Sequence, residues 1–301
     1  MIRVVFTIAF VFVSNQVAGS TEDTAHVKKS TIPPKVLNII YPKTLPSLVE
    51  EVYYPLILLD TALKRSGYKY KLTAAPKLLG QNRVLKEIEH GGDIDVTWTM
   101  TNKVREDKLL PVRVPIFKGL FGWRLMFTTE PKLPYLGRLK TLDDLKKVYF
   151  VQGQDWPDTQ ILRDNGLVIS TSGNFDSLFV MLDRGRGDLF PRSVLEIEDE
   201  LAVFKQQMPL VVLPHLMLKY TSPIYFFFNK DNTEVAKAVN KGLRIMIESG
   251  EFDEIFFKYN GKLIENAHIH DKIIVELENK ELPPLTPVGD KSLWLPIQKV
   301  K

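Results

Sequence analysis

Residues 91–107 (GGDIDVTWTMTNKVRED) bring side chains that can bind an anion to the end of a predicted buried strand. Trp98, Thr99 and Thr101 close this strand, and Arg105 follows them. A guanidinium holds a carboxylate through two parallel hydrogen bonds, and threonine hydroxyls can complete the shell. Because open α/β sheets bind ligands at the carboxyl ends of their strands, these residues form half of a candidate binding site. The alternative is that Thr101 caps a helix and Arg105 lies on its solvent face.

Residues 148–162 (VYFVQGQDWPDTQIL) contain a second junction between a predicted strand and a predicted helix. The strand ends in Gln152 and Gly153, and the free N–H groups of the following helix attract an anion. Trp156 is either a platform for a flat or apolar ligand or a plug beneath the loop. We include all three residues in the candidate site.

Residues 181–193 (MLDRGRGDLFPRS) predict a helix end, a charged turn and a short buried strand. Arg192 and Ser193 lie at the far end of this strand, and Arg192 is assigned to an anionic group of the ligand. We expect Arg192→Glu to abolish binding of an acidic ligand and to leave thermal stability nearly unchanged. Tyr41, at the end of the predicted strand over residues 35–41, completes the candidate contacts.

Motifs for catalysis and cofactor binding are absent from the sequence. It has no Gly-x-Ser-x-Gly, no His-Glu-x-x-His, no phosphate-binding loop and no dinucleotide Gly-x-Gly-x-x-Gly. His268 and His270 could share one face of a strand, but no third ligand lies at helpful spacing. The chain has no cysteine, which excludes disulfides, thiolate metal sites, Cys nucleophiles and a lipid anchor on Cys. We expect no metal, no cofactor and no catalytic residue.

The bulk properties are those of an ordinary globular protein of roughly two domains. The chain has 301 residues, 45% of them hydrophobic, and a net charge of +4 that is spread along the sequence. No basic block interleaved with aromatic residues appears, so nucleic acid is not an expected partner. Residues 1–19 have the pattern of a secretory signal peptide, and no later apolar segment is long enough to span a membrane. We expect a periplasmic protein without a lipid anchor.

Strand and helix patterns alternate along the chain, which favours α/β layers with a largely parallel sheet. The alternation begins with the apolar strand over residues 35–41 and repeats after residue 139. Residues 232–261 predict two amphipathic helices split at Ser249 and Gly250. The proline-rich residues 278–296 predict an extended strap over a finished surface.

The order of these pieces resembles that of bacterial type II periplasmic solute-binding proteins of family 3, the amino-acid-binding kind. Residues 82–119 (NRVLKEIEHGGDIDVTWTMTNKVREDKLLPVRVPIFKG) resemble the lobe-one segment of that family. Residues 139–154 (LKTLDDLKKVYFVQGQ) are similar to the opening of its second lobe, and residues 177–193 to its helix, turn and binding strand. Residues 222–261 are similar to its return to lobe one, so the resemblance covers roughly residues 35–261.

The resemblance implies a two-lobed α/β fold, each lobe a mostly parallel sheet flanked by helices. Its implied boundaries are a signal peptide over 1–19, lobe 1 over 20–123, lobe 2 over 124–224 and the rest of lobe 1 over 225–301. Hinge strands are expected near residues 122–127 and 223–228. The implied function is capture of a small ligand between the lobes, for an ABC transporter for amino acids or a sensor in the membrane, by a protein that acts as a monomer.

The sequence departs from the family pattern at the ligand. Family members that bind amino acids present a carboxylate near the positions of Arg192 and Ser193, and neither position is Asp or Glu here. The spacing from Thr101 to Arg105 is one residue longer than usual. These differences favour an anionic or aromatic ligand over a plain amino acid.

Two other functions stay open at this point. Relatives that are exported dehydratases suggest an enzyme on the same scaffold, for which Asp155 and Glu196 are the candidate general acids. A cleft without ligand that serves as an interaction module of the cell envelope is the other alternative. We expect a binding protein and not an enzyme.

Overall fold

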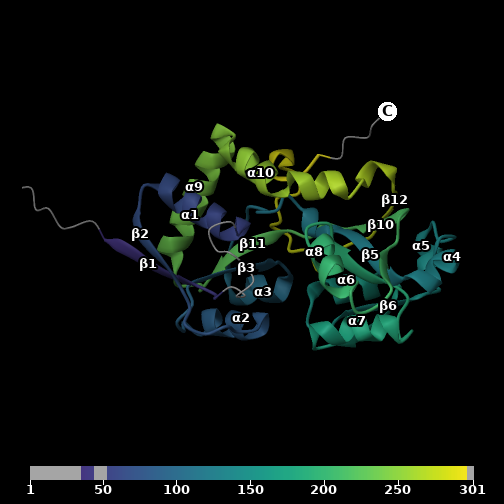
Figure 1. Ribbon diagram of the computed structural model, residues 1–301. Coiled ribbons are helices and arrows are strands. Elements are labelled where there is room, and N and C mark those ends of the chain that lie inside the picture. The colour runs from purple at the N-terminus through teal and green to yellow at the C-terminus, as the bar shows by residue number, and fades with distance from the viewer. Residues whose placement is uncertain (1–34, 44–52, 297–301) are drawn as a thin grey trace, which may run out of the picture. The chain divides into compact units, whose positions relative to one another are not determined.

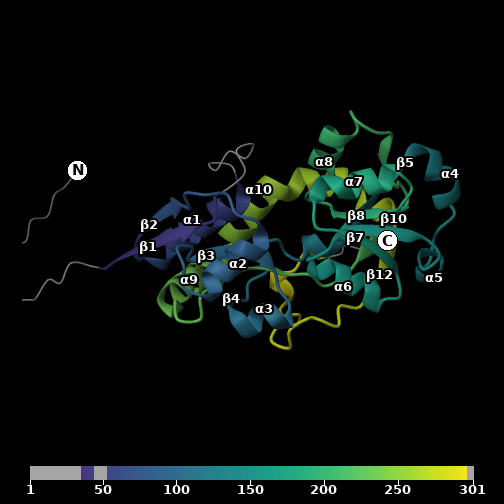
Figure 2. The same cartoon turned by 90° about the horizontal axis from the view of Figure 1, so that it is seen from below.

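The computed structural model describes residues 35–43 and 53–296, and the chain from Lys35 onward forms one compact unit. The predicted signal peptide over 1–19 lies outside the described residues. Figures 1 and 2 show the helices and strands of this unit in two groups, which we call lobe 1 and lobe 2. No helix in the described ranges is long and apolar enough to cross a membrane.

Lobe 1 is built on two small sheets. Its strands are β1 (Val36–Tyr41), β2 (Lys69–Ala74), β3 (Val96–Met100), β4 (Leu110–Val112) and β11 (Ile224–Phe228). β1 pairs with β2 in parallel, and β11 lies between β3 and β4, antiparallel to both. The helices are α1 (Tyr54–Ser66), α2 (Gln81–Glu89), α3 (Lys103–Lys108) and α9 (Thr233–Ser249).

The sequence of β11, IYFFF, accounts for its central place. Alternate residues of a strand face opposite sides, and here both sides are apolar. Phe226 and Phe228 pack into the main core, whereas Tyr225 and Phe227 pack into a second cluster that includes Val84 and Ile88 of α2. The strand is therefore buried along its whole length.

Lobe 2 is built on a five-stranded sheet and a two-stranded one. The larger sheet has the order β12-β10-β5-β8, with β9 also paired to β5, and the smaller one pairs β6 with β7. The strands are β5 (Trp123–Thr129), β6 (Tyr149–Gly153), β7 (Val168–Ser172), β8 (Phe190–Ser193), β9 (Leu210–Val212), β10 (Leu216–Lys219) and β12 (Ile273–Glu276). The helices are α4 (Leu133–Leu136), α5 (Leu142–Leu145), α6 (Pro157–Asp164), α7 (Phe175–Asp183) and α8 (Ile197–Phe204).

The strand directions differ from the expected mostly parallel sheets. Five strand pairs are antiparallel, namely those of β11 with β3 and β4 and those of β5 with β8, β9 and β10, against three parallel pairs. The physical reason lies in the crossings between lobes, because β5 and β11 each enter a lobe from the other one. Each of them is therefore antiparallel to its neighbouring strands in the lobe that it enters.

Two chain segments connect the lobes side by side, directly before the strands expected to form the hinge. The backbone N–H of Tyr220 donates to the carbonyl of Gly122 (3.0 Å), and the backbone N–H of Ile116 donates to the carbonyl of Ile224 (3.0 Å). Gly122 has no side chain to keep them apart, since a Cβ there would lie 1.8 Å from the carbonyl oxygen of Tyr220. A glycine is needed where the two hinge segments touch.

The C-terminal part of the chain serves both lobes. α9 packs on α1, where Gly242 lets the backbone of Ala62 come close, and α10 (Glu251–Asn266) follows a left-handed Gly250. β12 then pairs in parallel with β10. This corrects the expected boundary, since residues 273–276 complete the sheet of lobe 2 and do not belong to lobe 1. The other lobe boundaries stay a prediction.

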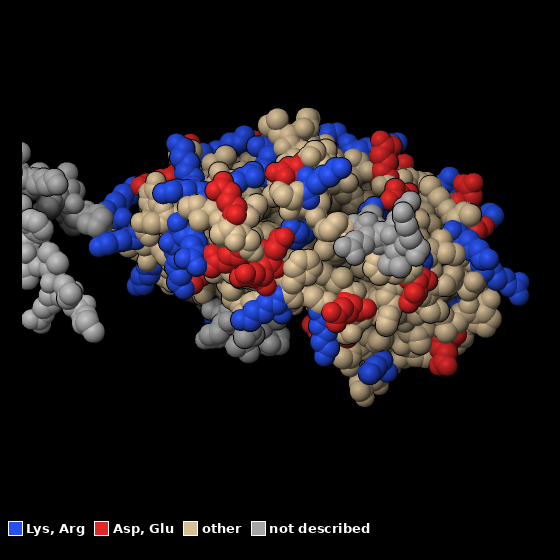
Figure 3. All heavy atoms as spheres, turned by 90° about the horizontal axis from the view of Figure 1, so that it is seen from above, with Lys and Arg blue, Asp and Glu red and all other residues tan. Residues whose placement is uncertain are grey.

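Residues 277–296 form the expected extended strap. Asn279 donates to the carbonyl of Thr221 in the hinge (2.8 Å), and the backbone N–H of Leu295 donates to Lys118 (2.9 Å). The indole of Trp294 packs over Gly119, where a Cβ would lie 2.7 Å from the ring. On the face shown in Figure 3, basic and acidic side chains are intermixed, in keeping with a net charge spread along the chain.

Candidate ligand-binding site

A hollow of about 290 Å³ lies between the lobes, and we call it the interlobe hollow. Fifteen residues line it, and five of them are predicted site residues, namely Trp98, Thr99, Arg105, Trp156 and Arg192. The sequence analysis did not assign the other ten to the ligand: Tyr53, Gln81, Met100, Phe117, Phe121, Arg124, Pro157, Asp158, Glu196 and Ile224.

Arg105 reaches the hollow from α3, which answers the question that the sequence left open. Asn102 caps the helix by accepting from the backbone N–H of Arg105 (2.8 Å), and Thr101 instead donates to Glu106 (2.7 Å). The guanidinium is buried and donates to Thr99 Oγ1 (2.7 Å), the Met100 carbonyl (2.6 Å) and Gln81 Oε1 (2.9 Å). It therefore does not lie on the solvent face of the helix.

Arg105 is the guanidinium of the hollow that has no carboxylate partner among the described residues. Burial lowers the pKa of Arg105 to about 10, and Asp158 across the hollow acts in the opposite direction. The side chain stays charged at neutral pH because this value is far above 7. A buried cation held only by neutral groups is ready to bind an anion.

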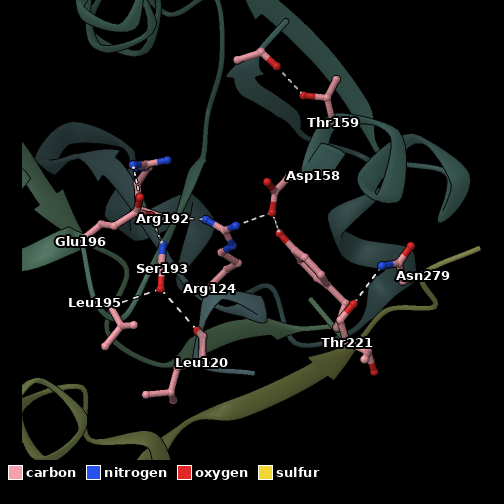
Figure 4. A network of polar contacts seen from close by, with 12 residues as sticks. Leu120, Arg124, Asp158, Thr159, Arg192, Ser193, Leu195, Glu196, Thr221 and Asn279 are labelled. Atoms are coloured by element: carbon pink, nitrogen blue, oxygen red, sulfur yellow. Dashed lines mark hydrogen bonds and ion pairs between the residues drawn. The ribbon is translucent and has the colours of Figure 1, made fainter. Parts of the chain in front are cut away.

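Arg124, at the start of β5, forms the centre of a buried network in lobe 2 (Figure 4). Its guanidinium and the hydroxyl of Tyr220 both donate to the carboxylate of Asp158 in the first turn of α6. A second ion pair joins Arg124 to Glu196 at 3.5 Å. Burial raises the pKa of Tyr220 well above its usual value, so its hydroxyl stays protonated as a donor. Neither spacing nor pattern marks these partners in the sequence.

Arg192 lies at the hollow as predicted, but its guanidinium is already paired. It donates to Glu200 through Nε (2.7 Å) and lies 3.0 Å from Glu196, and it packs 4.8 Å from the ring of Trp156. Neither position is Asp or Glu, but the turn into α8 brings the carboxylate of Glu196 back to Arg192 and Ser193. Glu196 also accepts from the backbone N–H of Ser193 (3.2 Å).

Four predicted residues are buried outside the hollow. Tyr41 is in the core, and Ser193 donates to the carbonyl of Leu120 (3.3 Å). Gln152 is fully buried, and its amide has no partner among the described residues. Gly153 lies beneath the ring of Trp156, which a Cβ would approach to 2.4 Å. Trp156 thus both lines the hollow and covers the end of β6. With Thr101, five predicted contacts are buried and do not line the hollow.

Trp98 is held by a residue that the sequence analysis missed. Its indole N–H donates to the hydroxyl of Tyr53 (3.2 Å), and the two rings lie 5.7 Å apart. Tyr53 immediately precedes α1, whose first turn contains Pro55. Proline fits a first turn because it needs no hydrogen bond there, so Pro55 is compatible with the start of α1.

The charges of the hollow are divided between the lobes. The wall from lobe 1 has one cation, Arg105, and no carboxylate, whereas both lining carboxylates, Asp158 and Glu196, come from lobe 2. These two acids are paired with Arg124 and Arg192. The free positive charge of the hollow is therefore on the side of lobe 1.

The described residues contain no group of three or more His, Cys, Asp or Glu that could hold a metal. His268 adopts a left-handed backbone just before a short 3-10 helix that contains His270, so the two do not share a strand. Asp155, a candidate general acid, is exposed and accepts from Asn82 of lobe 1 (2.9 Å). Glu196, the other candidate, is held by two arginines.

Several solved structures with the same fold are described as binding proteins. A probable amino-acid ABC transporter extracellular-binding protein of Bacillus subtilis, ytmK, is 16% identical with a TM-score of 0.58 and matches 76% of this chain and 99% of its own. An ancestral arginine-binding protein bound to arginine is 20% identical with a TM-score of 0.51 and matches 74% and 97%. The arginine-, lysine-, histidine-binding protein ArtJ of Geobacillus stearothermophilus is 16% identical with a TM-score of 0.52 and matches 75% and 96%.

These comparisons confirm the two-lobed α/β fold of type II periplasmic binding proteins, the fold that the sequence resemblance implied. By sequence, no family model and no curated protein matches the chain.

Proposed function

We propose that this protein is an exported solute-binding protein that captures a small carboxylate between its two lobes. Arg105 carries the proposal, because it is the charged group of the hollow that the described residues leave without a counter-ion. A carboxylate there would gain charge-assisted hydrogen bonds to a guanidinium that is itself buried. Closure of the lobes would bury the rest of the ligand.

The hollow also limits what else the ligand carries. Arg124 and Arg192 are paired, so a second anionic group has no free cation to bind. Trp98, Phe121 and Trp156 offer aromatic surface for a flat or apolar body. The carboxylates of lobe 2 favour a donor at the other end of the ligand. An aromatic or amino-acid-like acid meets these conditions, whereas a dianion does not.

The similar structures support transport as the setting. They are binding proteins, one of which is described as an extracellular component of an amino-acid ABC transporter. We place this protein in the periplasm as a monomer that hands its ligand to a membrane transporter or sensor. We assign no catalytic residue and no cofactor to it.

A thermal-shift screen of amino acids, organic acids and aromatic acids tests the proposal. A ligand present at 100 times its Kd adds about 2.7 kcal/mol of stability, which raises the melting temperature by about 5 °C in a chain of this size. We expect at least one acid to do so, and Arg105→Gln to abolish the shift. Arg83→Gln, which changes an exposed guanidinium of lobe 1, is the matched control and should keep it.

One observation favours a second function. Most polar groups of the hollow already satisfy one another, as expected of a cleft that has become an interaction surface of the cell envelope. In that case no small molecule shifts the melting temperature. The same screen therefore separates the two functions.

A further inference from the structure

Tyr53 occupies a place from which it can select the ligand. It lies at the start of α1 and lines both the interlobe hollow and an adjoining pocket of lobe 1 whose walls include Leu78, Leu79 and Val84. Trp98 shares both linings and fixes the tyrosine through its indole N–H. Tyr53 therefore lies where the two spaces meet, with its hydroxyl bonded to Trp98.

The hydroxyl of Tyr53 has an unused hydrogen. A phenol can both donate and accept. Tyr53 accepts from Trp98, but within residues 35–43 and 53–296 it donates to no acceptor. Tyr53 is only half-buried and lines the interlobe hollow, so a ligand in the hollow can reach it. What is missing beside Tyr53 is an acceptor.

The surroundings of Tyr53 keep its hydroxyl protonated. Burial raises the pKa of Tyr53, the hydrogen bond from Trp98 lowers it, and the negative charge of Glu196 across the hollow raises it again. The net direction is upward, so the phenol is neutral at physiological pH. Tyr53 then presents a donor on the same lobe as the cation of Arg105.

We infer that Tyr53 is a specificity-determining residue that donates its hydroxyl hydrogen to an acceptor oxygen of the captured acid. This inference rests on the proposed function and deepens it. The guanidinium of Arg105 and the phenol of Tyr53 are both donors on lobe 1, so they select acceptor groups of the ligand. A carboxylic acid with its aromatic or apolar body toward Trp98 fits both, whereas the corresponding neutral amide would place its NH₂ group against donors. The cleft therefore selects acids over their amides.

Phenylacetate and phenylacetamide make a suitable pair of probes, because they differ in charge and donor pattern but hardly in shape. L-Phenylalanine tests whether an added ammonium group is accepted. We expect wild type to bind at least one of the two acids and to prefer phenylacetate to its amide. Tyr53→Phe removes only the hydroxyl and should weaken binding of the acid about tenfold, the loss expected for a hydrogen bond to a charged group.

Tyr70→Phe is the matched control, since its hydroxyl bonds to Asp60 away from the hollow, and it should leave the affinity unchanged. An unchanged affinity of Tyr53→Phe, with binding still lost in Arg105→Gln, would overturn the role of Tyr53 and leave the proposed function standing. If wild type binds neither acid probe and no acid of the wider screen, both the role of Tyr53 and the proposed function are contradicted. Melting temperatures of the unliganded variants show whether each one is folded.

Discussion

Arg192 is held inside lobe 2 by two carboxylates and by aromatic rings on several sides. Its guanidinium pairs with Glu196 and Glu200 and packs against Trp156, Phe175 and Phe190. Removing the cation from a buried ion pair strongly destabilises the folded protein, because the carboxylate stays buried without a partner. This residue therefore stabilises the lobe, and the expectation that Arg192→Glu spares thermal stability is corrected.

We predict that Arg192→Met lowers the free energy of unfolding by about 3–5 kcal/mol, because it leaves Glu200 buried without a partner. Chemical denaturation measures this. Arg186→Met, at an exposed position of the preceding turn, should cost little. The double variant Arg192→Met, Glu200→Leu should recover most of the loss, and an additive loss instead would show that the ion pair is not the reason.

The residue types at the site were predictable, but their partners were not. Arg105 and Arg192 both follow predicted strands, and nothing local distinguishes the free guanidinium from the paired one. The difference comes from Glu196 and Glu200, which a turn brings back over β8. Arg124 and Asp158 are 34 positions apart and meet only through the packing of α6 on lobe 2.

At the scale of elements, the contact between the hinge segments depends on one residue without a side chain. We predict that Gly122→Ala costs at least about 2 kcal/mol of stability or separates the segments, because its Cβ would overlap the carbonyl oxygen of Tyr220. Gly261→Ala, in the interior of α10 where a Cβ meets nothing within 4 Å, should instead stabilise by up to about 1 kcal/mol. Thermal unfolding of both variants compares them directly. Equal effects of the two changes would mean that close approach at the hinge is unimportant.

The helices and strands themselves follow local sequence, and most predicted ones are present. The two helices predicted over residues 232–261 span Thr233–Ser249 and Glu251–Asn266, and they divide at Gly250. Strand direction and the place of β12 depend on which lobe the chain has just left. That information lies in contacts distant along the sequence, so local periodicity does not contain it.

At the scale of the whole molecule, a hydrogen bond joins the lobes beside the hollow, between the sequence neighbours of its lining residues Gln81 and Trp156. Asn82, in the first turn of α2, donates to Asp155, which lies just before α6. α2 has no side-chain cap and no acid in its first turn, so a carboxylate from the other lobe is favourably placed there. Both residues are exposed, and the contribution is small.

We predict that Asp155→Ala loosens closure without unfolding either lobe. The melting temperature of the unliganded protein should change by less than about 2 °C, whereas the affinity for a captured acid should fall a few-fold because the closed state is less populated. As a control, Asp164→Ala removes a carboxylate at the C-terminal end of α6 and should change neither quantity. Equal affinities of the two variants would show that this bond does not affect closure.

Capture between two lobes is tested most directly by the distance between them. The chain has no cysteine, so spin labels at Lys86→Cys in α2 and Val180→Cys in α7 report on the lobes alone. When the acid that raises the melting temperature most is added, we expect a shorter and narrower distance distribution. In labelled protein that also contains Arg105→Gln, the same acid should leave the distribution unchanged. A distribution that is the same with and without a bound acid would contradict the account.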